Sequence, residues 1–202
     1  MKKKTDYIWV VVILYAIFTL WYNGFMIESL AKYCKKHCIE VVRGSALNVA
    51  DRVLSCALEN NFDYFFRINA DSPFLKPSLI DTAYYIALSS DNEVVTNLFP
   101  RTFPYGVSVE LVNTNTFKRV YKQMYSQEHF EHVTLFFYQN MEHFRYYNIS
   151  SGRKGLNNFR LTIDTEEDLA KFNIFVGLLG DQWSHIDYFE AVNLYKHLLS
   201  KK

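Results

Sequence analysis

The sequence predicts an α/β fold in which helices cover both faces of a largely parallel sheet. Short apolar segments alternate with segments of three-four hydrophobic spacing along most of the 202 residues. Two of the apolar segments, residues 62–68 and 159–163, are each followed by an aspartate, Asp71 and Asp164. Strands that end this way bring a carboxylate to the carboxyl edge of an α/β sheet, where such sheets bind ligands.

The amino terminus allows two interpretations. Three lysines precede a stretch from Tyr7 to Ile27 that has no charged side chain. About 20 apolar residues can span a bilayer as a helix, and the lysines would keep the short end inside. Alternatively, residues 6–12 form a buried strand, and an apolar segment folded against the sheet follows. No small-x-small cleavage site is present, which argues against a signal peptide.

The first half of the chain continues with alternating elements. Residues 28–37 have apolar side chains on one helical face, and the short apolar run at 39–42 indicates a strand. Ser45 is a candidate cap for the next helix, which Asn60 and Asn61 stop. The strand at residues 62–68 follows. Pro77 then opens a helix, because proline fits the first helical position.

The second half shows the same alternation. The expected strands are residues 93–97, 107–112, 144–149 and 159–163, with loops at 100–106 and 150–158. Two helices are expected near residues 114–125 and 128–138. Asp164 or Thr165 caps a further helix through Leu178, in which Glu167 or Asp168 closes a capping box. An amphipathic helix near 182–199 ends the chain.

Composition narrows the class of protein. Half of the residues are apolar, so one domain of this length, with or without an appendage, can bury a sizeable core. The net charge is +1, from 22 basic and 21 acidic residues, which gives no electrostatic reason to expect nucleic acid as a partner. The three cysteines argue against a disulfide scaffold. Cys34 and Cys38 lack a second pair at zinc-ligand spacing and are interpreted as neighbours on one helix face.

Asp71 and Asp164 could share one divalent metal ion, and a metal ion at a sheet edge suggests phosphate chemistry. Each aspartate also has a structural interpretation. Asp71 could cap the turn before Pro73, and Asp164 could be the N-cap of the helix that follows it. His129 and His132 do not form the H-E-x-x-H zinc motif, so packing or surface roles are expected for them from spacing alone.

Seven short motifs occur in a fixed order over roughly residues 27–178. In this order they resemble the cytidylyltransferases that make CMP-activated sugars, in particular the spore-coat polysaccharide and acylneuraminate branch. The motifs are VRGS at 42–45, NVADR at 48–52, RINADSPFL at 67–75, PRTFPYG at 100–106, VEL at 109–111, EHVT at 131–134 and RLTIDTEEDL at 160–169.

The resemblance implies a Rossmann-like nucleotide-diphosphosugar transferase fold with three layers and a mostly parallel mixed sheet. It divides the chain into an apolar N-terminal segment (1–26), an α/β domain (27–180) and a C-terminal helix (181–202). The implied reaction transfers CMP from CTP to a sugar or sugar acid for surface polysaccharide biosynthesis, and pyrophosphate is released. Proteins of this family often pair, so a homodimer is one implied arrangement.

The resemblance also implies roles for individual residues. Asp71 and Asp164 correspond to Mg²⁺ ligands, in agreement with their positions at the ends of expected strands. The remaining matches are the catalytic residues Arg67 and Arg101, the nucleotide-side residues Arg43, Asp51 and Arg52, and the sugar-side residues Glu110 and His132.

The N-terminal part departs from the family pattern. The family begins with a first strand and a loop rich in Gly, Arg and Lys, which holds the CTP phosphates. Residues 1–12 resemble the family's second strand instead, so we expect an N-terminally truncated member with impaired CTP binding. Two alternatives are a catalytically inactive remnant and a membrane-tethered interaction protein. The supply of CTP favours the cytoplasm, and membrane association through residues 7–27 is the alternative.

Overall fold

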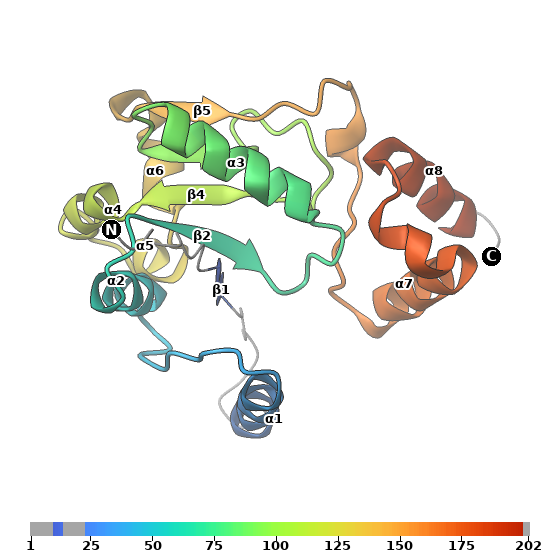
Figure 1. The fold of residues 1–202 in the computed structure, drawn as a ribbon, viewed down its shortest axis with the longest axis horizontal. Coiled ribbons are helices and arrows are strands. Elements are labelled where there is room, and N and C mark those ends of the chain that lie inside the picture. Colours follow the sequence, from blue (N-terminus) through green and yellow to red (C-terminus); the bar gives the residue numbers. More distant parts are fainter. Residues whose placement is uncertain (1–9, 14–22, 200–202) are drawn as a thin grey trace, which may run out of the picture.

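A five-stranded mixed sheet forms the centre of the structure (Figure 1). The computed structural model describes residues 10–13 and 23–199, and side chains from Glu28 to His197. β1 pairs in parallel with β2 and β5 pairs in parallel with β3, whereas β4 is antiparallel to both of its neighbours. The predicted mostly parallel mixed sheet is therefore confirmed. The spatial order is β1 (Val10–Ile13), β2 (Tyr64–Asn69), β4 (Glu110–Asn113), β3 (Val94–Thr96), β5 (Tyr146–Asn148).

β4 runs against the other strands because a loop without a helix leads into it. Parallel neighbours need a long crossover connection, usually a helix, whereas an antiparallel neighbour can follow a direct return. Residues 97–109 contain no helix. The buried Asn97 side chain closes this loop, since it donates to the Val107 carbonyl and accepts from the Val109 N–H, both at 2.9 Å. The carboxyl ends of β2 and β3 therefore meet the start of β4 at one edge of the sheet.

Helices cover both faces of this sheet. In Figure 1, α3 lies across one face, α2 and α4 lie on the other side, and α7 and α8 lie beyond the end to which β2 and β5 point. Short 3₁₀ segments occur at Met141–His143, Leu156–Asn158 and Gly180–Ser184. The helices of the described residues are α1 (Asn23–Lys36), α2 (Val49–Glu59), α3 (Pro77–Ser89), α4 (Thr114–Tyr121), α5 (Gln127–Glu131), α6 (Leu135–Gln139), α7 (Glu166–Leu179) and α8 (Tyr188–Leu199).

Adjacent residues of the strands pack into two separate cores. Phe66 and Val95 belong to the core that includes α3 and the C-terminal helices. Phe65 and Val94 belong to the core formed with α2, α4 and α6. This follows from the two-residue period of a strand. All four side chains are almost fully buried, and each such burial stabilises the fold by about 1.5–3 kcal/mol. The three-layer arrangement is thus built from alternation within the strands.

β1 bears on the two interpretations of the amino terminus. Val10–Ile13 pair with residues 66–69 of β2, which confirms the predicted strand at residues 10–12. The rest of that prediction, residues 6–9, lies outside the described residues, as do residues 14–22. Across the two described ranges, no helix combines the length and apolar character that a bilayer crossing requires.

The connection from α1 to α2 differs from the prediction. No strand forms at residues 39–42, whose apolar side chains are about half exposed and have no strand beside them to pair with. Ser45 does not cap α2, because its Oγ accepts the Leu47 N–H at 3.2 Å. Asn48 is the N-cap and accepts the Asp51 N–H at 2.9 Å. Asn48 takes this role because it directly precedes the first helical residue.

Other predicted elements are shorter or divided. The helix expected near 114–125 ends at Tyr121, and Ser126 caps a new helix by accepting the His129 N–H. The final helix near 182–199 divides into a 3₁₀ segment and α8. Residues 159–163 form no strand beyond one bridge, between Arg160 and Tyr105. The spacing of apolar residues continues across the points where these elements end, so periodicity alone does not predict where they end.

Candidate active site

Three polar residues lie at the end of β2. Arg67 and Asn69 are alternate residues of this strand and share a face, and Asp71 lies in the turn that follows. Arg67 is paired in register with Glu110, the first residue of β4. The sheet edge predicted from the strand-end aspartate therefore also carries an amide, a guanidinium and a second carboxylate.

The segment that carries Asp164 is hydrogen-bonded to the segment that carries Asp71. The Ile163 N–H donates to the Asp71 carbonyl at 2.9 Å. Extended segments joined in this way lie about 5 Å apart, so the backbones at Asp71 and Asp164 are neighbours. Although residues 159–163 do not form the predicted strand, they bring the two aspartates to the same edge.

Gly106 fixes the other end of this segment. The Tyr105 N–H donates to the Phe159 carbonyl, and the Leu161 N–H donates to the Tyr105 carbonyl, both at 2.8 Å. Gly106 has φ +87°, and a Cβ there would lie 2.8 Å from the Leu161 carbonyl carbon. Only glycine allows this close approach of two backbones.

Asp164 is not the cap of α7. Thr165 is the N-cap, and its side chain and that of Asp168 form the predicted capping box. Asp164 Oδ2 instead accepts from the Thr162 hydroxyl and from Arg160 Nη1, the latter at 3.1 Å. Within the described ranges its Oδ1 makes no hydrogen bond. One carboxylate oxygen is thus held by the protein and the other is available to a ligand.

A cavity of about 260 Å³ lies at the end of β2 and is lined by Arg67, Asn69, Ala70, Asp71 and His132. The structure thus brings together three of the sequence-predicted site residues, Arg67, Asp71 and His132. The Oδ1 atom of Asn69 is buried and has no hydrogen-bond partner among the described residues. A buried polar atom without a partner costs about 1–3 kcal/mol, so a donor or cation in the cavity would relieve this cost.

Arg67 is held from behind by a buried network. Its Nη1 donates to Glu110 Oε2 at 2.5 Å, and the Tyr138 hydroxyl donates to Glu110 Oε1 at 2.8 Å. Glu110 is only 1% exposed, so it lies behind Arg67 and not on the cavity surface. Burial and the Glu110 carboxylate raise the pKa of Tyr138 well above its ordinary value. The hydroxyl therefore stays protonated and remains a donor to Glu110.

The other predicted site residues lie away from this cavity. Arg43 forms an ion pair at 3.1 Å with Glu28, and both side chains are more than half exposed. Asp51 lies in the first turn of α2, and the stem of Arg52 packs on Gly44. Of the described residues that line the cavity, none comes from this segment. The structure therefore does not group these three with Asp71.

Arg101 lies on the loop between β3 and β4. Its guanidinium is 4.5 Å from the centroid of the Tyr105 ring, and Arg160 is 5.4 Å from the same centroid. Arg101 also donates to the Pro104 carbonyl at 3.3 Å and to Ser108 Oγ at 3.4 Å. Because Arg160 binds Asp164 and Ile163 is bonded to Asp71, this loop is connected to both aspartates.

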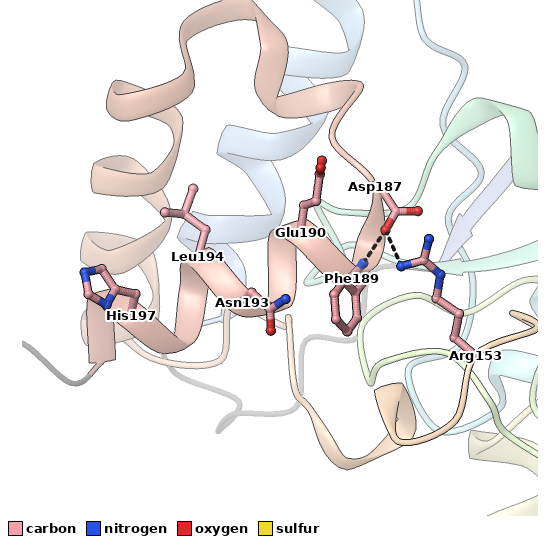
Figure 2. A pocket seen from close by; sticks show the side chains of 7 residues that line it. All are labelled: Arg153, Asp187, Phe189, Glu190, Asn193, Leu194 and His197. Atoms are coloured by element: carbon pink, nitrogen blue, oxygen red, sulfur yellow. Dashed lines mark hydrogen bonds and ion pairs between the residues drawn. The ribbon is translucent and has the colours of Figure 1, made fainter.

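A larger hollow of about 580 Å³ lies on the outer side of α8 (Figure 2). Two of its charged groups, Arg153 and Asp187, are paired with each other. Asp187 accepts from Arg153 at 3.4 Å and from the Phe189 N–H at 2.8 Å, and the Arg153 guanidinium lies 5.1 Å from the Phe189 ring centroid. Figure 2 shows Asp187 between these two groups. We therefore place the candidate active site at the smaller cavity.

A sequence profile described as Cytidylyltransferase matches residues 27–198. The chain belongs to the cytidylyltransferase family. The resemblance predicted from the seven motifs is thereby confirmed. Spore coat polysaccharide biosynthesis protein SpsF of Bacillus subtilis (strain 168) is 29% identical over 159 residues, 77% of this chain and 64% of SpsF. Uncharacterized protein MJ1063 of Methanocaldococcus jannaschii is 26% identical over 149 residues, 72% and 59% of the two chains. This cytidylyltransferase chain thus spans less than two thirds of either relative.

A solved structure shows the same fold. A cytidylyltransferase from Leptospira borgpetersenii serovar Hardjo-bovis (strain JB197) superposes with a TM-score of 0.80 and 24% identity, over 95% of this chain and 79% of that chain. The Rossmann-like mixed sheet is therefore shared with a cytidylyltransferase of known structure.

Sequence reasoning missed four residues at or near the candidate site. Asn69 could have been found from the alternation that places it on the same strand face as Arg67. Tyr138 gave no local signal, because it reaches Glu110 from a helix that starts 25 residues later. Tyr105 and Arg160 were parts of motifs, but only the bridge between their segments joins them.

Proposed function

We propose that this cytidylyltransferase chain transfers CMP from CTP to a sugar or sugar acid used in surface polysaccharide synthesis. The observation that carries the proposal is the hydrogen bond from the Ile163 N–H to the Asp71 carbonyl. It joins the backbone at Asp71, which lines a cavity together with Arg67 and His132, to the segment that precedes Asp164. Family membership supplies the nucleotide, and the relative SpsF suggests polysaccharide synthesis.

The oxygen atoms near this edge support the proposal that the enzyme uses a magnesium ion. The candidate ligands are the Asp71 and Asp164 carboxylates, and the buried Asn69 Oδ1 is a further oxygen without a partner among the described residues. No group of three or more His, Cys, Asp or Glu in the described ranges could enclose a metal ion. Mg²⁺ suits such an open site, because it keeps several waters and binds through one or two carboxylates plus substrate phosphates.

In the proposed reaction, the acceptor hydroxyl oxygen forms a bond to the α-phosphorus of CTP. The bond between that phosphorus and the bridging α–β oxygen breaks, pyrophosphate leaves with its electron pair, and the hydroxyl proton passes to solvent. Bound Mg²⁺ would neutralise phosphate charge. Arg67 would orient a phosphate oxygen through its fixed guanidinium, which Glu110 and Tyr138 hold in place. His132 would contact the substrate from the other wall of the cavity.

The test is an assay of the full 202-residue chain with CTP, Mg²⁺ and a panel of sugar acids and neutral sugars. We expect release of pyrophosphate and formation of a CMP-sugar that depend on both Mg²⁺ and one class of acceptor. Asp81→Asn, a change on the exposed side of α3, serves as the control and should leave the rate unchanged. Absence of Mg²⁺-dependent CTP binding and of pyrophosphate release would contradict the proposal.

A further inference from the structure

Arg101 is a partly buried cation without a counter-ion. In the described ranges no carboxylate forms an ion pair with it. The carboxylate that acts on it most strongly, Glu110, is already bound to Arg67 and Tyr138. Removing a charge from water is costly unless an opposite charge compensates it, so this position needs another explanation.

A second cation lies on the same aromatic ring. Arg101 and Arg160 are 4.5 Å and 5.4 Å from the Tyr105 centroid, so the two guanidinium groups are at most about 10 Å apart. Burial is the main cause that lowers the pKa of Arg101, and the Arg160 charge acts in the same direction. Two cations held this close, with one partly desolvated, favour an anion between or beside them.

The position remains open to solvent. The Tyr105 side chain is 46% exposed and that of Arg160 is 63% exposed. The backbone is nevertheless fixed, because Tyr105 is hydrogen-bonded to Phe159 and Leu161. Arg160 also binds Asp164, which places the two cations next to the proposed magnesium site.

We propose that Arg101 and Arg160, held on the ring of Tyr105, form an oxyanion-binding site for the substrates. The identity of the molecule that carries the oxyanion rests on the proposed function, whereas the binding of an oxyanion by the two arginines does not. Two sources share this chemistry: the carboxylate of a sugar acid acceptor, and the phosphates of CTP or of the pyrophosphate product. Guanidinium groups bind both kinds of oxyanion with paired N–H donors.

The test is calorimetric titration of the full chain in EDTA, so that a metal site contributes nothing. One probe is inorganic pyrophosphate, and the other is N-acetylneuraminate, with its uncharged methyl ester as the matched probe. The variants are Arg101→Gln and Arg160→Gln. Arg145→Gln is the matched control, because Arg145 is exposed, pairs with Asp91 at 3.1 Å and precedes β5 at the opposite edge of the sheet.

We expect at least one charged probe to bind the Arg101→Gln and Arg160→Gln variants about tenfold or more weakly than the wild type. Loss of pyrophosphate binding alone assigns the site to the nucleotide, and loss of N-acetylneuraminate binding alone assigns it to the acceptor. Equal affinities in wild type, Arg101→Gln and Arg145→Gln would overturn the proposal, as would no binding of either probe to the wild type.

Thermal unfolding separates this role from a structural one. Arg101→Gln loses no ion pair of the described chain, only the contact with Tyr105 and long hydrogen bonds to Pro104 and Ser108. It should therefore change the Tm little, whereas replacing an arginine that holds a buried carboxylate would lower the Tm clearly. Failure of the two hypotheses is also distinguishable. If the probes bind in an arginine-dependent way but no CMP is transferred, the oxyanion site is supported and the proposed function is contradicted. If CMP is transferred and the KM values of Arg101→Gln equal those of the wild type, the function is supported and the oxyanion site is contradicted.

Discussion

Two hollows lined by described residues differ in how far their polar groups are paired. In the larger one, beside α8, Arg153 is paired with Asp187 and stacked on Phe189. In the smaller one, at the end of β2, Asp71 lies beside an Asn69 oxygen that is buried without a partner among the described residues. The paired Arg153 and Asp187 have less to offer a ligand than a buried oxygen without a partner has. The presence of polar groups without partners is therefore a better guide to the site than the volume of a cavity.

The same contrast holds for two arginines. Arg153 and Arg101 each lie over an aromatic ring, at 5.1 Å and 4.5 Å from its centroid. Arg153 has Asp187 as its counter-ion at 3.4 Å, whereas no ion pair of Arg101 occurs in the ranges described. The comparison assigns Arg153 to structure and Arg101 to substrate binding. Matched substitutions, one in each hollow, can test whether the two hollows differ in function.

The largest expected effect is on catalysis. Asp71→Asn removes a charge from the proposed magnesium site and should slow Mg²⁺-dependent pyrophosphate release by about 100-fold or more. Asp187→Asn makes the same chemical change in the larger hollow, and its rate should stay within about twofold of the wild type. Steady-state assays of both variants check this. A comparable loss in both, or in neither, would remove the distinction between the two hollows.

The second effect is on stability. Glu110→Ala removes the carboxylate to which Arg67 is bound, and Arg67 has a side chain only 14% exposed. Breaking a buried pair costs about 3–5 kcal/mol of unfolding free energy. Glu190→Ala, at an exposed residue of the larger hollow, should change it by less than about 0.5 kcal/mol. Urea unfolding measures both values. If Glu110→Ala costs no more than Glu190→Ala, Arg67 is not held in the way described.

The third effect is on the Tm and concerns the close approach of the Gly106 and Leu161 backbones. Gly106 and Gly155 have nearly the same φ, +87° and +82°, but a Cβ at Gly155 meets nothing within 4 Å. Gly155→Ala therefore pays about 1–2 kcal/mol for the left-handed backbone alone. Gly106→Ala should cost more, because its Cβ would also overlap the backbone of Leu161. Equal shifts in Tm for the two variants would show that the close contact between Gly106 and Leu161 does not hold the 159–164 segment in place.

The smallest effect concerns the capping box next to Asp164. Hydrogen bonds from the Thr165 hydroxyl and from two backbone N–H groups hold the pKa of Asp168 below its ordinary value near 3.8. A carboxyl with a lowered pKa in the folded state stabilises the protein above its unfolded pKa, and this contribution is lost as pH falls through the folded pKa.

Asp168→Ala should therefore lower the unfolding free energy by about 1 kcal/mol at pH 7. Urea unfolding should show this difference shrinking as the pH falls below about 4, because the wild-type carboxyl then becomes protonated and loses its charge. Glu166→Ala, at an exposed residue of the same first helical turn, is the control and should lack this pH dependence. A difference that is constant from pH 7 to pH 3 would contradict the proposed role of the charge.

Asp71 could be predicted at the end of a strand because its signal is local. An apolar run followed by Asp71 is visible in a few consecutive residues, and so is the capping box of α7. The partners of Arg67 could not be predicted from pattern, because Glu110 and Tyr138 are 43 and 71 residues away and meet it only through the sheet.

The connecting segment gave a misleading local signal for a related reason. Residues 159–163 have the composition of a strand, but their backbone groups bond to a loop and to Asp71 instead of to a sheet neighbour. The hydrogen-bond partner of such a segment depends on where the rest of the fold leaves unpaired backbone groups. The position of Asp71 could thus be predicted from sequence, while the contact that brings Asp164 to it required the structure.

The most direct test of the central claim is a titration of CTP into four forms of the full chain, in the presence and absence of Mg²⁺. The forms are the wild type, Asp71→Asn, Asp164→Asn and the double variant. If both carboxylates hold one ion, each single change should abolish the Mg²⁺-dependent part of CTP binding, and the double change should add almost nothing. An Asp164→Asn variant that binds CTP with wild-type Mg²⁺ dependence would contradict the shared site.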